Sequence, residues 1–134
     1  MKTVRNISIL FITLAFAGST LLHSNDIPGN IVNAIKNGNA KELAGYFNSS
    51  IELTLLSKED IYSKEQAEII LKNFFQTHVP VSFTLLHEGG KESSKYAIGN
   101  LKTGNGNFRV TILLKSQNNQ LYIHQLRIEG DNVE

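Results

Sequence analysis

The chain of 134 residues contains no cysteine and no tryptophan, and it has only two prolines and one methionine. The absence of cysteine excludes disulfide bonds, thiolate metal ligands, a cysteine nucleophile and lipid attachment at a mature N-terminal cysteine. A strong charge imbalance is also missing, since 13 basic and 12 acidic residues give a formal net charge of +1. The few arginines are scattered and form no basic stripe, so the sequence favours no nucleic-acid partner.

The composition that is present fits an ordinary globular protein, with 41% hydrophobic and 19% charged residues. A chain of this length is expected to form one domain, with a core large enough to need no metal or disulfide. We find no internal repeat and no low-complexity segment. Residues 18–25 are expected to form a linker, and residues 26–134 a single domain.

Residues 1–17 have the pattern of a secretory signal peptide. Lys2 and Arg5 precede an apolar run over residues 7–17, which ends on the small-x-small triplet Ala15-Phe16-Ala17. This run is shorter than the ~20 apolar residues that span a bilayer. We predict cleavage and an exported, soluble protein, periplasmic or secreted, that is not a lipoprotein and has no stable membrane span. The alternative is an uncleaved anchor extending through Leu22.

Helical periodicity dominates the first half of the predicted domain. A first helix is expected after Asp26 as N-cap, with Ile27, Ile31 and Ile35 on one face and Gly38 at its end. A short second helix is expected to turn Leu43, Ala44 and Phe47 inward. The clearest helix follows Ser63, which forms a capping box with Gln66. Its apolar positions have the spacing of one helix face: Ala67, Ile70, Leu71, Phe74 and Phe75.

Strand periodicity dominates the rest. Residues 51–55 alternate between apolar and polar side chains after an expected break at Asn48-Ser49-Ser50, and a short extended piece is expected at Ile61-Tyr62. Four further strands are expected at 81–88, 95–103, 108–115 and 121–129, as an antiparallel meander. The expected turns are Gly89-Gly90, residues 104–106 and Asn118-Asn119.

The register of the last hairpin decides which residues of the final strand point inward. A simple two-residue turn would pair Leu114 with Ile123 and would place Arg127 on the apolar face. We therefore predict a register shifted by one residue, which pairs Leu114 with His124, Ile112 with Leu126 and Val110 with Ile128. His124 and Tyr122 would then lie inside and Arg127 outside. In the alternative, Arg127 faces inward and anchors an anionic ligand.

The order of these elements resembles the nuclear transport factor 2-like superfamily, whose cystatin-like α+β fold is a cone of helices packed in a curved, mainly antiparallel sheet. Three stretches carry the resemblance: IVNAIKNGNAKELAGYF, SKEQAEIILKNFF and LYIHQLRIE. The chain is also similar to a family of small secreted bacterial proteins of this superfamily with no established function. The resemblance implies three N-terminal helices in a cone, but it selects no activity, because the superfamily contains both enzymes and binding modules.

Candidate site residues follow from chemistry and from expected position. The four histidines lack metal-ligand spacing, so no metal and no cofactor is predicted. His124 with a nearby tyrosine could perform acid–base catalysis, whereas the simpler interpretation is a core histidine or one that faces a dimer partner. The candidate cone-lining residues are Tyr46, Phe47, Phe74, Tyr122 and His124.

These patterns leave three functional hypotheses. The first is a non-catalytic exported module that binds a small apolar ligand or an envelope protein and forms a homodimer through its sheet. The second is a small enzyme of the isomerase, dehydratase or hydrolase kind, and the third is a purely structural assembly domain. The homodimer is predicted because apolar residues occur on both faces of the expected meander, at Leu85-Leu86, Leu113-Leu114 and residues 121–128.

Overall fold

The structure, a computed structural model, describes residues 26–131, so the predicted signal peptide and linker lie outside the described residues. The elements in chain order are α1 (Gly29–Lys36), α2 (Ala40–Ala44), β1 (Phe47–Leu55), β2 (Lys58–Ser63), α3 (Lys64–Thr77), β3 (Pro80–Lys91), β4 (Ser94–Thr103), β5 (Gly106–Gln117) and β6 (Gln120–Gly130). Within residues 26–131, no helix is long and apolar enough to cross a membrane.

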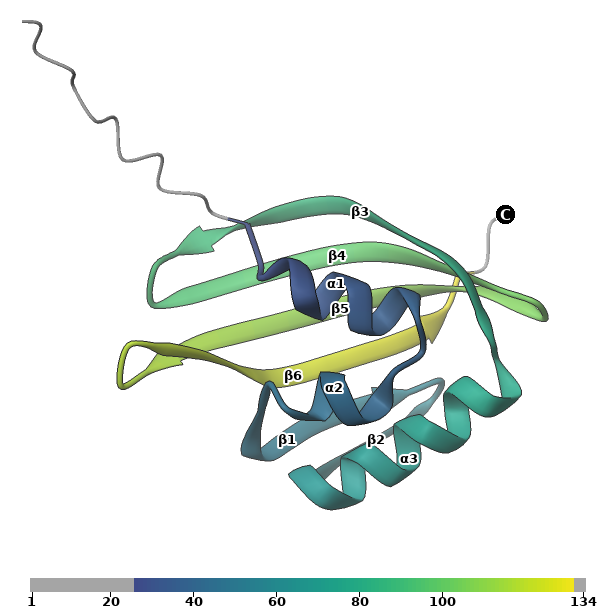
Figure 1. The fold of residues 1–134 in the computed structure, drawn as a ribbon, viewed down its shortest axis with the longest axis horizontal. Coiled ribbons are helices and arrows are strands. Elements are labelled where there is room, and N and C mark those ends of the chain that lie inside the picture. The colour runs from purple at the N-terminus through teal and green to yellow at the C-terminus, as the bar shows by residue number, and fades with distance from the viewer. Residues whose placement is uncertain (1–25, 132–134) are drawn as a thin grey trace, which may run out of the picture.

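All six strands form one curved sheet in the order β2-β1-β6-β5-β4-β3 (Figure 1). The predicted meander of four antiparallel strands is confirmed in β3 to β6, and β1 joins it by parallel pairing with β6. α1 and α2 lie on one side of this sheet, and α3 packs against β1 and β2. The fold is α+β as expected, but the three helices are not all N-terminal, because α3 follows β1 and β2.

The predicted start of α3 is confirmed, and the predicted start of α1 is wrong. Ser63 Oγ accepts a hydrogen bond from Gln66 N at 3.2 Å, which confirms the predicted start of α3. Asn39 caps α2 in the same way, through Glu42 N at 3.0 Å. Asp26 is not the N-cap of α1, because the helix begins after Pro28, which supplies no side-chain acceptor.

Two predicted breaks are parts of strands. Asn48-Ser49-Ser50 belongs to β1, although β1 and β6 lose register between Phe47 and Glu52. Gly89-Gly90 lies within β3, and the turn is at residues 92–93. A Cβ on Gly90, whose φ is +110°, would collide with the Ser94 carbonyl oxygen, so this pair permits a close strand approach rather than a turn.

The last hairpin combines the two registers considered above. Asn118 and Asn119 both have positive φ, +52° and +61°, and form a two-residue turn that pairs Leu114 with Ile123. The predicted pairing of Leu114 with His124 is therefore wrong. A bulge then inserts His124, and beyond it Ile112 pairs with Leu126 and Val110 with Ile128, as predicted. The bulge keeps the apolar residues inward on both sides of His124.

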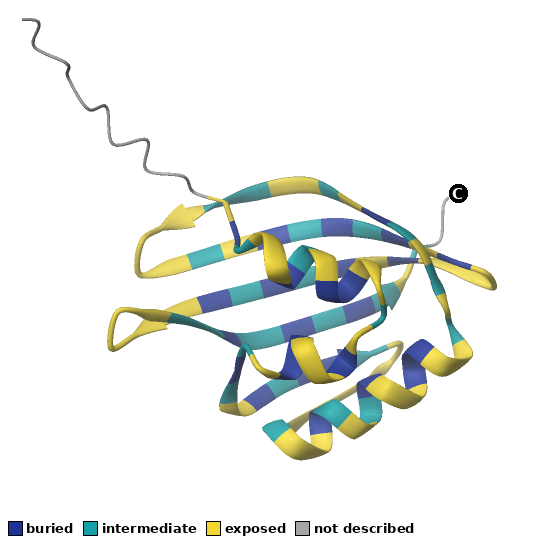
Figure 2. Cartoon of the chain, viewed as in Figure 1, coloured by how far each residue is buried: buried dark blue, intermediate teal, exposed yellow. Residues whose placement is uncertain are grey.

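The core lies between the helices and the sheet, where buried positions alternate along β4, β5 and β6 (Figure 2). Apolar side chains from both layers fill this space with at most 1% exposure: Ile31, Ile35, Leu43, Phe47, Ile51, Leu71, Ile112, Leu114, Ile123 and Leu126. Full burial of such side chains contributes ~1.5–3 kcal/mol each. The interior of the cone is thus a packed core.

Replacing Gly99 by alanine is expected to destabilise the fold by about 1–3 kcal/mol, because extra atoms in a packed core force their neighbours to move. A Cβ at this buried position would lie 2.5 Å from Cζ of Phe83 and 2.9 Å from the Thr84 carbonyl oxygen. Gly104→Ala is the matched control, since no atom of the described part of the chain lies within 4 Å of a Cβ there. Urea unfolding of both variants measures the difference, and equal midpoints would contradict the packing described.

Candidate functional site

The five predicted cone-lining residues do not share one cavity. Phe47 and Phe74 are core residues with 1% and 5% exposure, and Tyr46 packs partly buried against the same core. Tyr122 lies opposite Lys115, and its hydroxyl donates to Gln120 Oε1 at 3.1 Å. His124 lies with Glu52, Ile61 and Leu113 on the face of the sheet away from α1 and α2, so its predicted position inside the cone is wrong. We call this the outer face of the sheet, and several polar and charged side chains lie on it.

His124 lies at an interruption of the sheet. In its pairing with β5, β6 has a bulge at His124. In its pairing with β1, the register shifts: Phe47 is paired with Ile123, and the next pair is Glu52 with Gln125. The gap forms a small pocket of 230 Å³ lined by Asn48, Ser50, Ile51, Glu52, Ile61, Leu113, Lys115, His124 and Gln125. Nε2 of His124 is buried there, and it has no hydrogen-bond partner among the described residues. Bulges commonly redirect a side chain in this way.

Burial lowers the pKa of His124 below its ordinary value of 6.5, and the positive charge of Lys115 lowers it further. The folded protein therefore favours the neutral imidazole, whereas the unfolded chain takes up a proton as the pH falls through 6.5. The free energy of unfolding is therefore highest, as far as His124 is concerned, above pH 6.5. It decreases as the pH falls from 6.5 towards the lower pKa of the folded state.

Wild-type protein should consequently lose more stability between pH 7.5 and 5.5 than His124→Gln, which cannot gain this charge. Urea midpoints at several pH values measure the difference between the two profiles. His124→Asn, a second neutral replacement, should give the same profile as His124→Gln and so controls for the choice of the new side chain. Parallel profiles for wild type and His124→Gln would contradict the assigned burial of His124.

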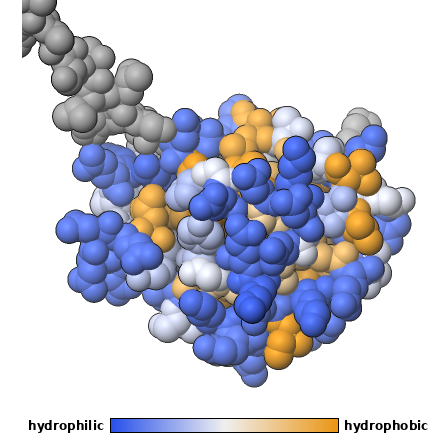
Figure 3. Space-filling model, in the orientation of Figure 1, coloured by the Kyte–Doolittle hydropathy of each residue, from blue (hydrophilic) through white to orange (hydrophobic). Residues whose placement is uncertain are grey.

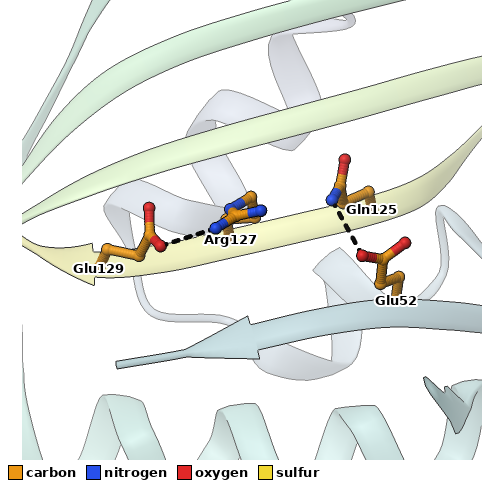
Figure 4. Close-up of polar contacts among 4 residues, drawn as sticks. All are labelled: Glu52, Gln125, Arg127 and Glu129. Carbon is orange, nitrogen blue, oxygen red and sulfur yellow. Dashed lines mark hydrogen bonds and ion pairs between the residues drawn. The ribbon is translucent and has the colours of Figure 1, made fainter. Parts of the chain in front are cut away.

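Polar and charged side chains lie in the middle of the outer face (Figure 4). Gln125 Nε2 donates to Glu52 Oε1 at 3.2 Å, and Arg127 pairs with Glu129 at 2.8 Å. Glu59 on β2 shares a hydrogen bond with Glu52, and that bond raises the pKa of Glu59. Arg127 lies on the side opposite to α1 and α2, as the sequence predicted, so it does not anchor a ligand inside the cone.

Large apolar side chains accompany these charges. Ile61 on β2 is 70% exposed and Tyr96 on β4 is 43% exposed. The half-buried Ile98 lies on β4 with Tyr96, and the half-buried Leu113 lies on the neighbouring strand β5. Three side chains that point to this face have a buried polar atom with no hydrogen-bond partner within residues 26–131: Thr54 Oγ1, Asn100 Oδ1 and His124 Nε2. No described helix or loop covers these residues.

The helix side has a different surface. It is mostly hydrophilic, with separate hydrophobic patches (Figure 3). A groove of 710 Å³ lies between the α1–α2 turn and α3, with Lys41, Lys72 and Glu68 beside Ile69 and Phe75. The groove has the volume of a small-molecule site, but the residues predicted to line the cone do not contribute to it.

Metal binding finds no support in residues 26–131, where no three histidine, aspartate or glutamate side chains are grouped to hold an ion. His78 instead stacks on Phe74, with ring centroids 4.5 Å apart, and meets the edge of Phe108 at 5.1 Å. His23 lies outside the described residues.

Comparison with known proteins identifies relatives of the whole fold. A domain of unknown function, DUF4783, matches residues 28–129. Crystal structures of DUF4783 family proteins from Bacteroides ovatus and Bacteroides uniformis are each 34% identical to the chain; they cover 81% and 80% of it and 98% and 99% of their own length, with TM-scores of 0.76 and 0.77. A designed protein of the Rd1NTF2 series is 13% identical over 75% of the chain and 90% of its own, with a TM-score of 0.61, and shows the nuclear transport factor 2-like fold alone. A search of curated proteins gave no match.

Proposed function

Because this chain belongs to the DUF4783 family, whose description assigns no activity, we propose from its own surface that it is a non-catalytic protein-interaction module that works as a homodimer. Two copies are joined through the outer faces of their sheets. The observation that carries the proposal is the uncovered apolar and charged outer face described above, centred on Ile61, Tyr96 and the Glu52–Arg127 region.

The size of this face suits a stable dimer. Most of the six strands are 9–12 residues long. With strands ~4.8 Å apart and a rise of ~3.3 Å per residue, the face measures roughly 900 Å², close to the ~800 Å² per partner of a standard interface. The exposed aromatic and aliphatic groups, with charged groups beside them, have the mixed composition of protein–protein interfaces.

The other hypotheses have less support. The buried apolar side chains of residues 26–131 fill the interior of the cone and leave little room there for a small apolar ligand. The pocket at His124 has 230 Å³, below the ~300–1,000 Å³ of ordinary ligand sites, and the Tyr122 hydroxyl is bonded to Gln120 rather than to His124. The 710 Å³ groove between the α1–α2 turn and α3 lies on the helix side, so a dimer formed through the outer face would not cover it.

The protein is exported and loses residues 1–17, as the Lys2/Arg5 segment and the triplet Ala15-Phe16-Ala17 indicate. Intact-mass measurement on protein from the envelope or medium of the native host tests this. The expected mass lacks the signal peptide. A mature species that still begins at Met1 would contradict cleavage.

Light scattering at micromolar concentration tests the dimer. Residues 26–134 should show twice the mass of one chain, and Ile61→Lys should shift the protein to the monomer by placing a charge in the interface. Ile69→Lys is the matched control, since Ile69 on α3 is comparably exposed, at 60%, but lies away from the outer face. A wild-type monomer, or an equal effect of both variants, would refute the proposal.

A further inference from the structure

Resting on the proposed homodimer, we infer how the two copies are oriented: their two-fold axis runs parallel to the strands, between β5 and β6. This axis places the acidic half of one outer face on the basic half of the other.

The outer face is divided by charge. Outward positions of β1 and β2 carry Glu52 and Glu59 and, among these described positions, no basic residue. Outward positions of β3, β4 and β5 carry basic residues and, within the same described strands, no acidic residue: His87, Lys91, Lys102, Arg109 and Lys115. The central strand β6 carries both signs, as the Arg127–Glu129 pair.

A dimer that joins two identical faces has its two-fold axis in the plane between them. If that axis runs across the strands, each strand faces its own copy. The acidic β1 and β2 would then meet acidic strands, and the basic β4 and β5 would meet basic strands. Like charges placed against each other cost several kcal/mol, so this arrangement is disfavoured.

If the axis runs along the strands, the sheet order is reversed across the interface. β6 then faces β5 of the partner, β1 faces β4, and β2 faces β3. Rotation about this axis does not change the position of a residue along the strand direction, so residues that are paired within one sheet come opposite each other across the interface. Glu129 is paired with Arg109, and Arg127 with Thr111. Glu129 therefore faces Arg109 of the partner subunit, and the symmetry makes this pair twice.

The other two acidic residues also meet suitable donors. Residues paired from strand to strand form a row across the sheet. One such row contains Glu52, Leu113 and Tyr96, and the next outward-pointing row contains Glu59, Ile98 and His87. Across the interface, Glu52 comes opposite the hydroxyl-bearing Tyr96 of the partner subunit. Glu59 comes opposite the partner's His87, which can donate a hydrogen bond to a carboxylate.

The apolar groups fit the same orientation. Ile61 shares a row with Gly89, and comes opposite Gly89 of the partner subunit. Gly89 has no side chain of its own, and Tyr96 lies over it, with the hydroxyl oxygen 2.7 Å and the nearest ring carbons 2.8 Å from where the Cβ of another residue would be. The most exposed aliphatic side chain of the face thus meets an aromatic surface.

The pair nearest the axis is the best defined. Packed sheets are rotated by about 30° relative to each other, which displaces contacts in proportion to their distance from the axis. Glu129 and Arg109 are about half a strand spacing from the axis, a displacement of roughly 1 Å, whereas contacts between β1 and β4 shift by about one residue. A cross-linker with a short flexible spacer accommodates that shift.

Site-directed cross-linking tests the orientation in a chain with no cysteine of its own. Glu52→Cys and Tyr96→Cys are made as single variants with different affinity tags, co-expressed in pairs and treated with a short bismaleimide. Glu52→Cys with Tyr96→Cys should give a cross-linked heterodimer, while Glu52→Cys alone should give none. Within one chain, two strands separate β1 from β4, and Ile69→Cys on α3 serves as the control for random collision.

The outcomes separate the two proposals. A dimer by light scattering that cross-links through Glu52→Cys alone would overturn the orientation and leave the homodimer intact. A dimer with no cross-link in any combination would overturn it as well. A monomer in solution would overturn the proposed function itself.

Discussion

Replacement of Phe47 by alanine should destabilise the protein by about 3–5 kcal/mol, as expected for removal of a phenyl ring from a packed core. Phe47 is 1% exposed and begins β1 beside Ile123 of β6. The adjacent backbone bond, from Ile123 N to the Tyr46 carbonyl at 2.7 Å, fixes the ring over the core. Urea unfolding of the variant measures the loss.

The same experiment decides between a core role and a ligand-lining role for this residue. A phenyl ring that lined an empty pocket could be removed with little loss of stability. Phe47→Leu is the matched variant, because it keeps most of the buried volume and should cost much less than alanine. A near-wild-type midpoint for Phe47→Ala would return Phe47 to the list of ligand-lining residues.

Reversing the charge of Arg109 should weaken the dimer by at least ~100-fold, since two symmetry-related contacts with Glu129 become repulsive. Arg109 is exposed in the monomer, so the fold should tolerate Arg109→Glu. Sedimentation equilibrium gives the dissociation constant, and circular dichroism verifies the fold. The double variant Arg109→Glu with Glu129→Arg restores that contact but loses the Arg127–Glu129 ion pair, so it should recover part of the affinity.

A control reversal on the helix side separates this effect from net charge. Lys72→Glu on α3 makes the same change of charge in the groove, away from the outer face. It should leave the dissociation constant unchanged within about twofold, because exposed charges beyond a Debye length of ~10 Å are screened. Equal weakening by both reversals would argue against a contact at Arg109.

Local signals in the sequence predicted the helices well. The capping box at Ser63 and the apolar spacing behind it identified α3, and both are independent of long-range pairing. The Gly89-Gly90 pair misled because a glycine pair serves equally in a tight turn and in a close approach of two strands. Only the structure, with the Tyr96 ring over Gly89, distinguishes the two uses.

The position of His124 shows the limit of register arguments. The two-residue turn at Asn118-Asn119 requires the register that pairs Leu114 with Ile123. Burial of the apolar side chains requires the register, shifted by one residue, that pairs Ile112 with Leu126. A bulge satisfies both, and it moves His124 from the expected inner face to the outer one. Periodicity alone does not reveal a bulge, because one inserted residue leaves the pattern on each side intact.

The charge division of the outer face was also hidden in the sequence. Glu52 and Arg109 are far apart in the chain, and their places on the face depend on the parallel pairing of β1 with β6. Alternation within each strand indicated which side chains point outward. The order of strands, set by long-range contacts, was needed to show that acidic and basic positions occupy separate halves.

Mixing two charge-reversed variants tests the self-complementary interface most directly. One variant replaces Glu52, Glu59 and Glu129 by lysine, and the other replaces Lys102, Arg109 and Lys115 by glutamate. At low salt each variant alone should sediment as a monomer, because the charged residues on the face of the first variant are then all basic and those on the face of the second are mainly acidic. The equimolar mixture should sediment as a heterodimer. Folded variants that dimerise alone, or that stay monomeric when mixed, would contradict an interface in which acidic and basic halves meet.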